Sequence, residues 1–205
     1  MKIDPVDNGN DLFAISDVFP SELLTRLHTK DLNQYKWQRE HMQEDLLRCK
    51  LLYNDSDILK EFDTFINKKD IIEQLSDTFS ETFHGVSCNF WLDKPGYTIS
   101  NHPDNPAVKH VIQIFLWPNN INLGTTFYHN KTTTSEFDNN GSWEFPTDDN
   151  INNLKLRKKF DYQINTGYVM NNLYQIHGMT EPVPQDSIRF SLYGHIGWHY
   201  TTPVL

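Results

Sequence analysis

Residues 71 to 92, IIEQLSDTFSETFHGVSCNFWL, contain the change of pattern that decides the fold. Up to Gly85 the apolar residues recur every three or four positions, which predicts an amphipathic helix that ends at this glycine. From Val86 onwards apolar and polar residues alternate, which predicts a strand with one face buried. The chain is therefore expected to change at about residue 85 from a mainly helical part to a part made of strands.

The flanking sequence extends both patterns. Two earlier stretches, 20–32 and 55–68, carry the same helical spacing as 69–85, and the first begins at Pro20-Ser21. Later stretches rich in β-branched and aromatic residues are separated by Asn, Gly and Pro, which predicts strands at 86–92, 110–117, 123–129, 160–164, 167–172 and 188–198. Helices followed by strands predict an α+β fold: a double-stranded β-helix, or jelly roll, supported by N-terminal helices. One domain is expected over 1–205, with 1–85 as mainly helical support and 86–205 as the sheet core.

Composition narrows the class of protein. The 205 residues carry a net charge of −9 and a pI near 5.4, which weighs against a nucleic-acid surface. The basic cluster at 155–159, KLRKK, is expected to be a solvated face. No apolar stretch approaches the roughly 20 residues of a membrane span, and the N-terminus has no apolar signal segment. These features and the two cysteines predict a cytoplasmic protein, and the Asn-rich composition fits the AT-rich genome of a marine microbe or phage.

The stretch at 129–159 is too long for a hairpin loop. Segments of this length in a compact domain are usually functional or disordered. Phe137, Trp143 and Phe145 lie within its polar sequence, so we expect a partly ordered lid. Trp143 is then a candidate contact for a substrate.

Two readings are open for His102 and Asp104, which precede the buried strand predicted at 110–117. The neighbouring Asn and Pro residues favour a solvated turn. Alternatively, residues i and i+2 of an extended segment point to the same face, which suits a metal site. The His-x-Asp pattern is too short to decide between them.

Three later residues give the pair a chemical context. His177 ends a predicted strand, and Arg189 and Ser191 lie two positions apart in the last one. Two imidazoles and one carboxylate form the facial triad of non-haem Fe(II) oxygenases, which leaves three coordination positions open. An arginine deeper in the barrel suits the distal carboxylate of a chelating cosubstrate, because its planar fork binds a carboxylate bidentately.

From about Phe90 to Trp198 the chain resembles the Fe(II)- and 2-oxoglutarate-dependent oxygenases, in particular their prolyl 4-hydroxylase-like branch. The stretch DKPGYTISNHPDN (93–105) is similar to the Pro-Gly turn that precedes the first metal histidine in that branch. LGTTF (123–127) is similar to its Gly-Gly-x-Thr-x-Phe strand. INTGYVMNNLYQIHGMTEPV (164–183) and SIRFSLYGHIGW (187–198) resemble the segments of the second histidine and of the cosubstrate anchor.

The resemblance implies a set of ligands and a reaction. Fe(II) would be held by His102, Asp104 and His177, and 2-oxoglutarate by Arg189 and Ser191. With O2, and with ascorbate in support, such enzymes release succinate and CO2 and hydroxylate an unactivated C–H bond. A prolyl or other residue of a protein or peptide and a small metabolite are all open as substrates. Aspartate in the second ligand position favours hydroxylation over halogenation.

The sequence also departs from the family pattern. The anchor is arginine, as in oxygen-sensing and many bacterial and phage members, whereas collagen-type enzymes have lysine. The tyrosine that often assists the anchor has no clear match in 110–117, so Gln113 or Thr126 is expected to replace it. Tyr97 is a candidate for the mouth of the site. The remaining histidines are read as structural or surface residues (His110, His129, His195 and His199).

Two other classes stay open at this level. One is a non-catalytic, cupin-like or jelly-roll binding module in which the histidines are structural, although such a module needs no buried arginine. The other is a zinc-type hydrolase or isomerase. Metal content and oxygen consumption discriminate between these classes and the oxygenase.

Overall fold

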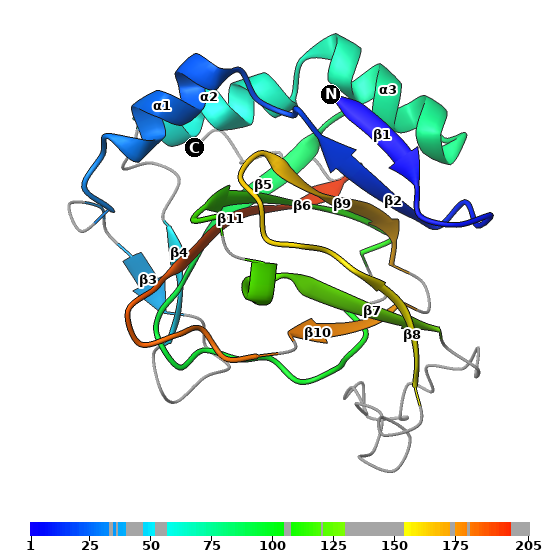
Figure 1. The fold of residues 1–205 in the computed structure, drawn as a ribbon. Coiled ribbons are helices and arrows are strands. Elements are labelled where there is room, and N and C mark those ends of the chain that lie inside the picture. Colours follow the sequence, from blue (N-terminus) through cyan, green and yellow to red (C-terminus); the bar gives the residue numbers. More distant parts are fainter. Residues whose placement is uncertain are drawn as a thin grey trace, which may run out of the picture.

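Two antiparallel sheets face each other in the structure (Figure 1). This computed structural model describes residues 1–32, 35, 37–39, 47–51, 57–104, 108–119, 121–129, 154–172, 175–179 and 181–197. The large sheet has the order β1 (Lys2–Pro5), β2 (Leu12–Ser16), β9 (Thr166–Asn171), β6 (His110–Trp117), β11 (Arg189–Ile196), β5 (Val86–Asp93), β4 (Arg48–Leu51) and β3 (Trp37–Arg39). The small sheet has the order β10 (Ile176–Met179), β7 (Thr125–His129) and β8 (Lys155–Lys159), and a short 3-10 helix, η3 (Ile121–Leu123), precedes β7. The predicted antiparallel sheets with a few supporting helices are confirmed, and their arrangement is consistent with a jelly-roll core.

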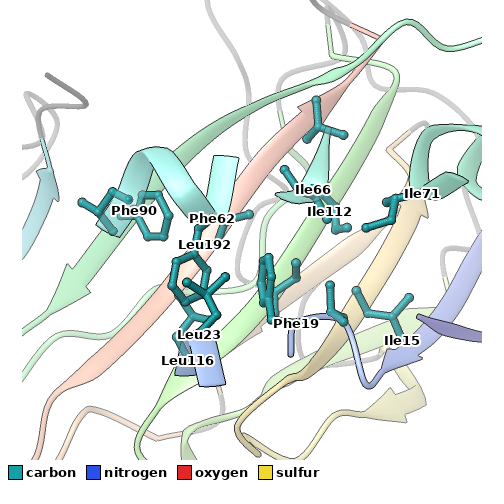
Figure 2. Packing of buried hydrophobic residues seen from close by; sticks show 14 of the residues in the cluster. Ile15, Phe19, Leu23, Phe62, Ile66, Ile71, Phe90, Ile112, Leu116 and Leu192 are labelled. Atoms are coloured by element: carbon teal, nitrogen blue, oxygen red, sulfur yellow. The ribbon is translucent and has the colours of Figure 1, made fainter. Parts of the chain in front are cut away.

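Three helices cover the face of the large sheet that lies away from the small sheet: α1 (Ser21–His28), α2 (Asp57–Ile66) and α3 (Lys69–Phe79) (Figure 1). Their apolar stripes pack against alternate residues of the central strands, among them Ile112, Leu116 and Leu192 (Figure 2). Burying each such side chain contributes about 1.5–3 kcal/mol. One face of the large sheet is therefore buried under the helices and forms part of the hydrophobic core.

The opposite face of the same strands looks towards the small sheet, and we call it the inner face. Val111 and Phe115 of β6, together with Tyr168 of β9, pack there in a second cluster with Phe127 of β7. Because side chains alternate along a strand, the odd-numbered residues of β5, β6 and β11 lie on the inner face. This alternation decides which polar side chains reach the space between the sheets.

The helix α3 ends earlier than its pattern predicts. Ser80 caps it in the left-handed conformation at φ 53°, and the Glu81 amide donates to the Ser76 carbonyl at 3.0 Å. The predicted stop at Gly85 is therefore wrong. Phe83, which continues the apolar spacing of the helix, is buried beyond the helix end, where it packs against Phe79.

Most predicted strands are present, with three differences. The predicted strand at 160–164 is wrong, because the strand in that region is β8 at Lys155–Lys159, within the segment expected to be lid and solvated face. The N-terminal third also contributes the four short strands β1–β4 to the edges of the large sheet. His177 lies within β10, not at the end of a strand. The rest of the expected lid, residues 130–153 with Trp143, lies outside the described residues.

None of the helices in the described part of the chain is long and apolar enough to cross a membrane.

Candidate metal centre

His102, Asp104 and His177 converge at one edge of the space between the two sheets. Their candidate ligand atoms all lie within 4.8 Å of one another. His102 Nε2 is 3.6 Å from Asp104 Oδ1, and His177 Nε2 is 3.7 Å from Asp104 Oδ2. Of the two readings of the His-x-Asp pair, the structure favours the shared site over the isolated turn.

The backbone holds the two histidines side by side. The His102 amide donates to the His177 carbonyl at 2.9 Å, and the His177 amide donates back at 3.0 Å. Gly178 permits this approach, because a Cβ there would lie 2.6 Å from Asn101 Oδ1 and 3.0 Å from the Asn101 nitrogen. Asp104 lies two residues after His102 in an extended segment, so its carboxylate points to the same side of the chain as the His102 ring.

Neighbouring groups orient the two imidazoles. Nδ1 of His102 lies 2.7 Å from the Ser100 carbonyl, to which it donates, so Nε2 carries the lone pair. Phe127, the cross-strand partner of His177, stacks on its ring at 5.2 Å and 24°. A hydrogen bond of this kind on the far nitrogen is the usual way in which a metal-binding histidine is held in one tautomer.

Tyr193 of β11 supports the carboxylate. Its hydroxyl donates to Asp104 Oδ2 at 3.0 Å. Burial raises the pKa of Asp104, but the charges of His177 and His102 and the hydrogen bond from Tyr193 outweigh it, so the net pKa is well below the usual range. Tyr193 was not singled out in the sequence, because only the fold brings residues 89 positions apart into contact.

The donor set suits a divalent metal ion. Burial lowers the pKa of His177 to about 4, so its ring is neutral at pH 7. Metal ligation requires neutral imidazole and ionised carboxylate, and both are present here before any ion binds. Two imidazole nitrogens and one carboxylate oxygen match the donor set of the facial triad expected for Fe(II).

Arg189 and Ser191 lie on the inner face of β11, and both are buried. Arg189 Nε is 3.0 Å from a carboxylate oxygen of Asp93, its partner on β5, and Nη1 donates to the Leu123 carbonyl at 3.2 Å. Asp93 also accepts from Arg48 Nε at 2.7 Å and Nη2 at 3.2 Å. Two guanidinium groups therefore share the buried carboxylate of Asp93.

A polar network surrounds Ser191. Gln113 Nε2 lies 3.3 Å from Ser191 Oγ, and the Tyr168 hydroxyl donates to Gln113 Oε1. Tyr162 lies over the Arg189 guanidinium at 5.5 Å and donates to the Phe190 carbonyl at 2.5 Å. Gln113 thus lies beside the expected anchor, as the sequence suggested, whereas Tyr162 was missed because its segment was read as an ordinary strand.

Thr126 and Tyr97 were the two other candidates from the sequence. Thr126 pairs with Gly178 and lies on the face of β7 opposite Phe127 and His177, whereas Thr125 shares their face. The buried Thr126 hydroxyl has no hydrogen-bond partner among the described residues, and the alternation makes Thr125 the better candidate for cosubstrate contact. Tyr97 is almost fully buried, with its ring 4.5 Å from the Arg48 guanidinium.

The other histidines have varied surroundings. His110 is buried between Phe79 and Phe83 under α3, which fits the structural role expected for it. His129 is exposed at the end of β7. His195 lies on the inner face beside Tyr193, with ring centroids 5.5 Å apart. His199 lies outside the described residues.

Comparison by sequence finds no matching family model and no similar curated protein. Comparison by structure finds clear similarity. A prolyl-4-hydroxylase from Pseudomonas putida has a TM-score of 0.58 and 11% identity, over 92% of this chain and 93% of that one. HygX from Streptomyces hygroscopicus, solved with nickel, 2-oxoglutarate and hygromycin B, has a TM-score of 0.62 and 10% identity, over 93% and 84%.

A third similar structure is SnoN, an α-ketoglutarate-dependent epimerase of nogalamycin biosynthesis. Its TM-score is 0.62 and its identity 11%, over 90% of this chain and 78% of that one. Identities this low establish the fold and nothing finer. The chain thus has the fold of the 2-oxoglutarate- and Fe(II)-dependent oxygenases, as the resemblance in its sequence predicted.

Proposed function

We propose that this protein is an Fe(II)- and 2-oxoglutarate-dependent dioxygenase that hydroxylates an unactivated C–H bond and releases succinate and CO2. The observation that carries the proposal is the pairing of two sites: an open triad of His102, Asp104 and His177, and a buried Arg189 on the inner face of the same fold. In this account the facing sheets are the double-stranded β-helix of these enzymes.

The residues of the chain have separate tasks. His102, Asp104 and His177 would hold Fe(II), which supplies the activation of O2 when it is bound. Arg189, helped by Ser191 and the Gln113–Tyr168 pair, would bind the distal carboxylate of 2-oxoglutarate. Asp93 holds the Arg189 guanidinium by an ion pair, with its carboxylate oxygen 3.0 Å from Nε. Hydrogen-bond donors that are already held in position can bind an anion without a rearrangement of the site.

The charge of the anchor supports an anionic cosubstrate. Arg48 and Arg189 both form ion pairs with the buried carboxylate of Asp93, where exposure to water is low. The two guanidinium groups make this a favourable place for the carboxylate of 2-oxoglutarate. Neither a structural jelly-roll module nor a zinc hydrolase requires a buried cation here, so both alternatives are less favoured.

The substrate class is wider than prolyl peptides. The three similar structures include a prolyl-4-hydroxylase, a protein solved with hygromycin B and an epimerase, so one fold serves several reactions. A residue of a protein or peptide, a free amino acid and a small metabolite are all compatible with the site.

Binding of 2-oxoglutarate tests the anchor directly. With the Mn(II)-loaded protein, we expect Arg189→Met to weaken 2-oxoglutarate binding by about 30-fold or more, because truncating one partner of a buried charge pair costs about 2–5 kcal/mol. Isothermal titration measures this, and metal affinity should be unchanged. Arg26→Met, at an exposed position of α1, is the matched control. Equal 2-oxoglutarate affinity in the native and Arg189→Met proteins would refute the anchor.

A further inference from the structure

Arg157 lies at a break in the strand pairing of the small sheet. The register of β8 against β7 shifts between Phe127 and Tyr128, and the ladder skips Arg157 at this point. A bulge of this kind re-aims a side chain, and bulges are frequent beside functional sites. Phe127 is also the cross-strand partner of His177, so the bulge lies level with a candidate metal ligand.

The guanidinium of Arg157 is fully engaged in hydrogen bonds. It donates to both carboxylate oxygens of Asp7, at 2.8 and 3.0 Å, and to both of Asp11, at 2.6 and 3.1 Å. A further bond runs from Nη1 to Gln175 Oε1 at 2.9 Å. These bonds use every N–H group of the guanidinium, and the side chain is only 8% exposed. The group therefore has one defined position.

Gln175 connects Arg157 to the strand that carries His177. It lies two residues before His177 and is buried. Both ends of its amide are held, because Oε1 accepts from Arg157 and Nε2 donates to Asp11 Oδ2 at 2.6 Å. β10 has four residues and lies at the edge of the small sheet. The held amide of Gln175 thus fixes the start of a short strand that has only β7 beside it in its sheet.

Asp11 is in turn fixed to the large sheet. It directly precedes β2, and its carbonyl accepts from the last amide of β9 at 2.8 Å. The metal centre is shared between the sheets, because His177 comes from β10 whereas Tyr193 of β11 holds Asp104. The bond from Gln175 to Asp11 therefore helps to set the distance between His177 and Asp104.

We propose that Arg157 is a positioning residue for the metal centre, and that through Gln175 it holds β10 so that His177 Nε2 faces Asp104. The inference rests on the proposed function, since it concerns the same metal site. Arg157 and Gln175 contact neither the metal nor a substrate in this account. They act by keeping a ligand in place, because a site whose ligands are already ordered loses less freedom when the ion binds.

Metal affinity tests the inference independently of activity. Electron paramagnetic resonance of free Mn(II) gives the affinity of the native chain, Arg157→Met, Gln175→Met and the double variant. We expect each single substitution to weaken Mn(II) binding by about fivefold or more, somewhat less than the roughly 10–100-fold typical of groups that contact a ligand directly. Since the two residues act in one series, the double variant should bind no more weakly than Arg157→Met. Lys155→Met, at an exposed position of the same strand, removes the same charge and should bind like the native protein.

The outcomes separate positioning from a merely structural role. Circular dichroism shows whether each variant is folded at the temperature of measurement, and if Arg157→Met is not, Gln175→Met, which changes no charge, decides alone. Native affinity in either folded single variant overturns the inference and leaves the proposed function standing. Losses that add in the double variant also overturn it, because the two residues then act separately. If the native protein binds no Mn(II), the proposed function fails, and this inference fails with it.

Discussion

At the scale of single residues, Tyr193 is the main supporting residue of the metal centre that the sequence did not predict. Its hydroxyl bonds one oxygen of Asp104 and leaves the other facing His102. We predict that Tyr193→Phe weakens Fe(II) or Mn(II) binding by about 10-fold or more, since the loss of such a supporting contact typically costs 10–100-fold. Competition with a metal-sensitive dye measures the affinity.

Tyr128→Phe is the matched control for this substitution, because Tyr128 lies on β7 and is only partly buried. The control is expected to bind metal like the native protein. Equal metal affinity in Tyr193→Phe and the native protein would mean that the phenol does not position the carboxylate.

Residues next to one another in sequence were accessible to prediction, and residues joined only by the fold were not. His102 and Asp104 share a motif, and His177 and Arg189 follow it in the order that the resemblance implies. Asp93 was only part of the Pro-Gly segment in sequence. Its role between two arginines arises because β5 lies between β4 and β11.

At the scale of elements, the end of α3 provides a stability test. Ser80 adopts φ 53°, a conformation that costs about 1–2 kcal/mol for residues with a Cβ. We predict that Ser80→Gly stabilises the protein by about 0.5–1 kcal/mol, which raises Tm by about 2–4 °C per kcal/mol for a chain of this size. Thermal unfolding followed by circular dichroism measures the change.

Glycine at Thr78, inside the same helix, should have the opposite effect. Thr78 has helical geometry and donates its hydroxyl to the Gln74 carbonyl at 2.8 Å. Thr78→Gly is expected to destabilise the protein by about 0.5–1 kcal/mol. A Ser80→Gly protein that melts at or below the native Tm would contradict the strain assigned to Ser80.

Element types were predictable where apolar periodicity is strong, as in α2, β6 and β11. The edge strands β1, β3 and β8 escaped prediction, because backbone pairing and polar contacts can hold an edge strand whose side chains are not apolar. β8 has the sequence KLRKK, and only its central Arg157 is part-buried, yet it pairs with β7, with a register shift between Phe127 and Tyr128. The helix end was misplaced because Phe83 continues the spacing of α3 after the helix has stopped.

At the scale of the whole molecule, Arg157 of β8 connects the loop between β1 and β2 with the segment that precedes β10. It bonds Asp7, Asp11 and Gln175, and Gln175 lies two residues before His177. The hydrogen bond from Arg157 outweighs burial and lowers the pKa of Asp7 to about 2. The network therefore connects distant parts of the chain through ionised carboxylates.

A lowered carboxyl pKa has a defined effect on stability. Because Asp7 binds its proton more weakly in the folded than in the unfolded chain, its contribution is complete above about pH 4 and is lost as the pH falls towards 2. We predict that Asp7→Asn flattens the fall of the unfolding free energy between these values. Urea unfolding at a series of pH values measures it, and an unchanged slope in Asp7→Asn would contradict the assignment.

The central claim is that this chain converts 2-oxoglutarate at a triad of His102, Asp104 and His177. The most direct measurement is succinate formed from 2-oxoglutarate with Fe(II), ascorbate and air, in the native protein and in Asp104→Ala. Enzymes of this class turn over slowly without a primary substrate, so we predict succinate from the native protein and none above background from Asp104→Ala. Equal succinate from both proteins, or none from a native protein that also fails to bind 2-oxoglutarate, would contradict the account.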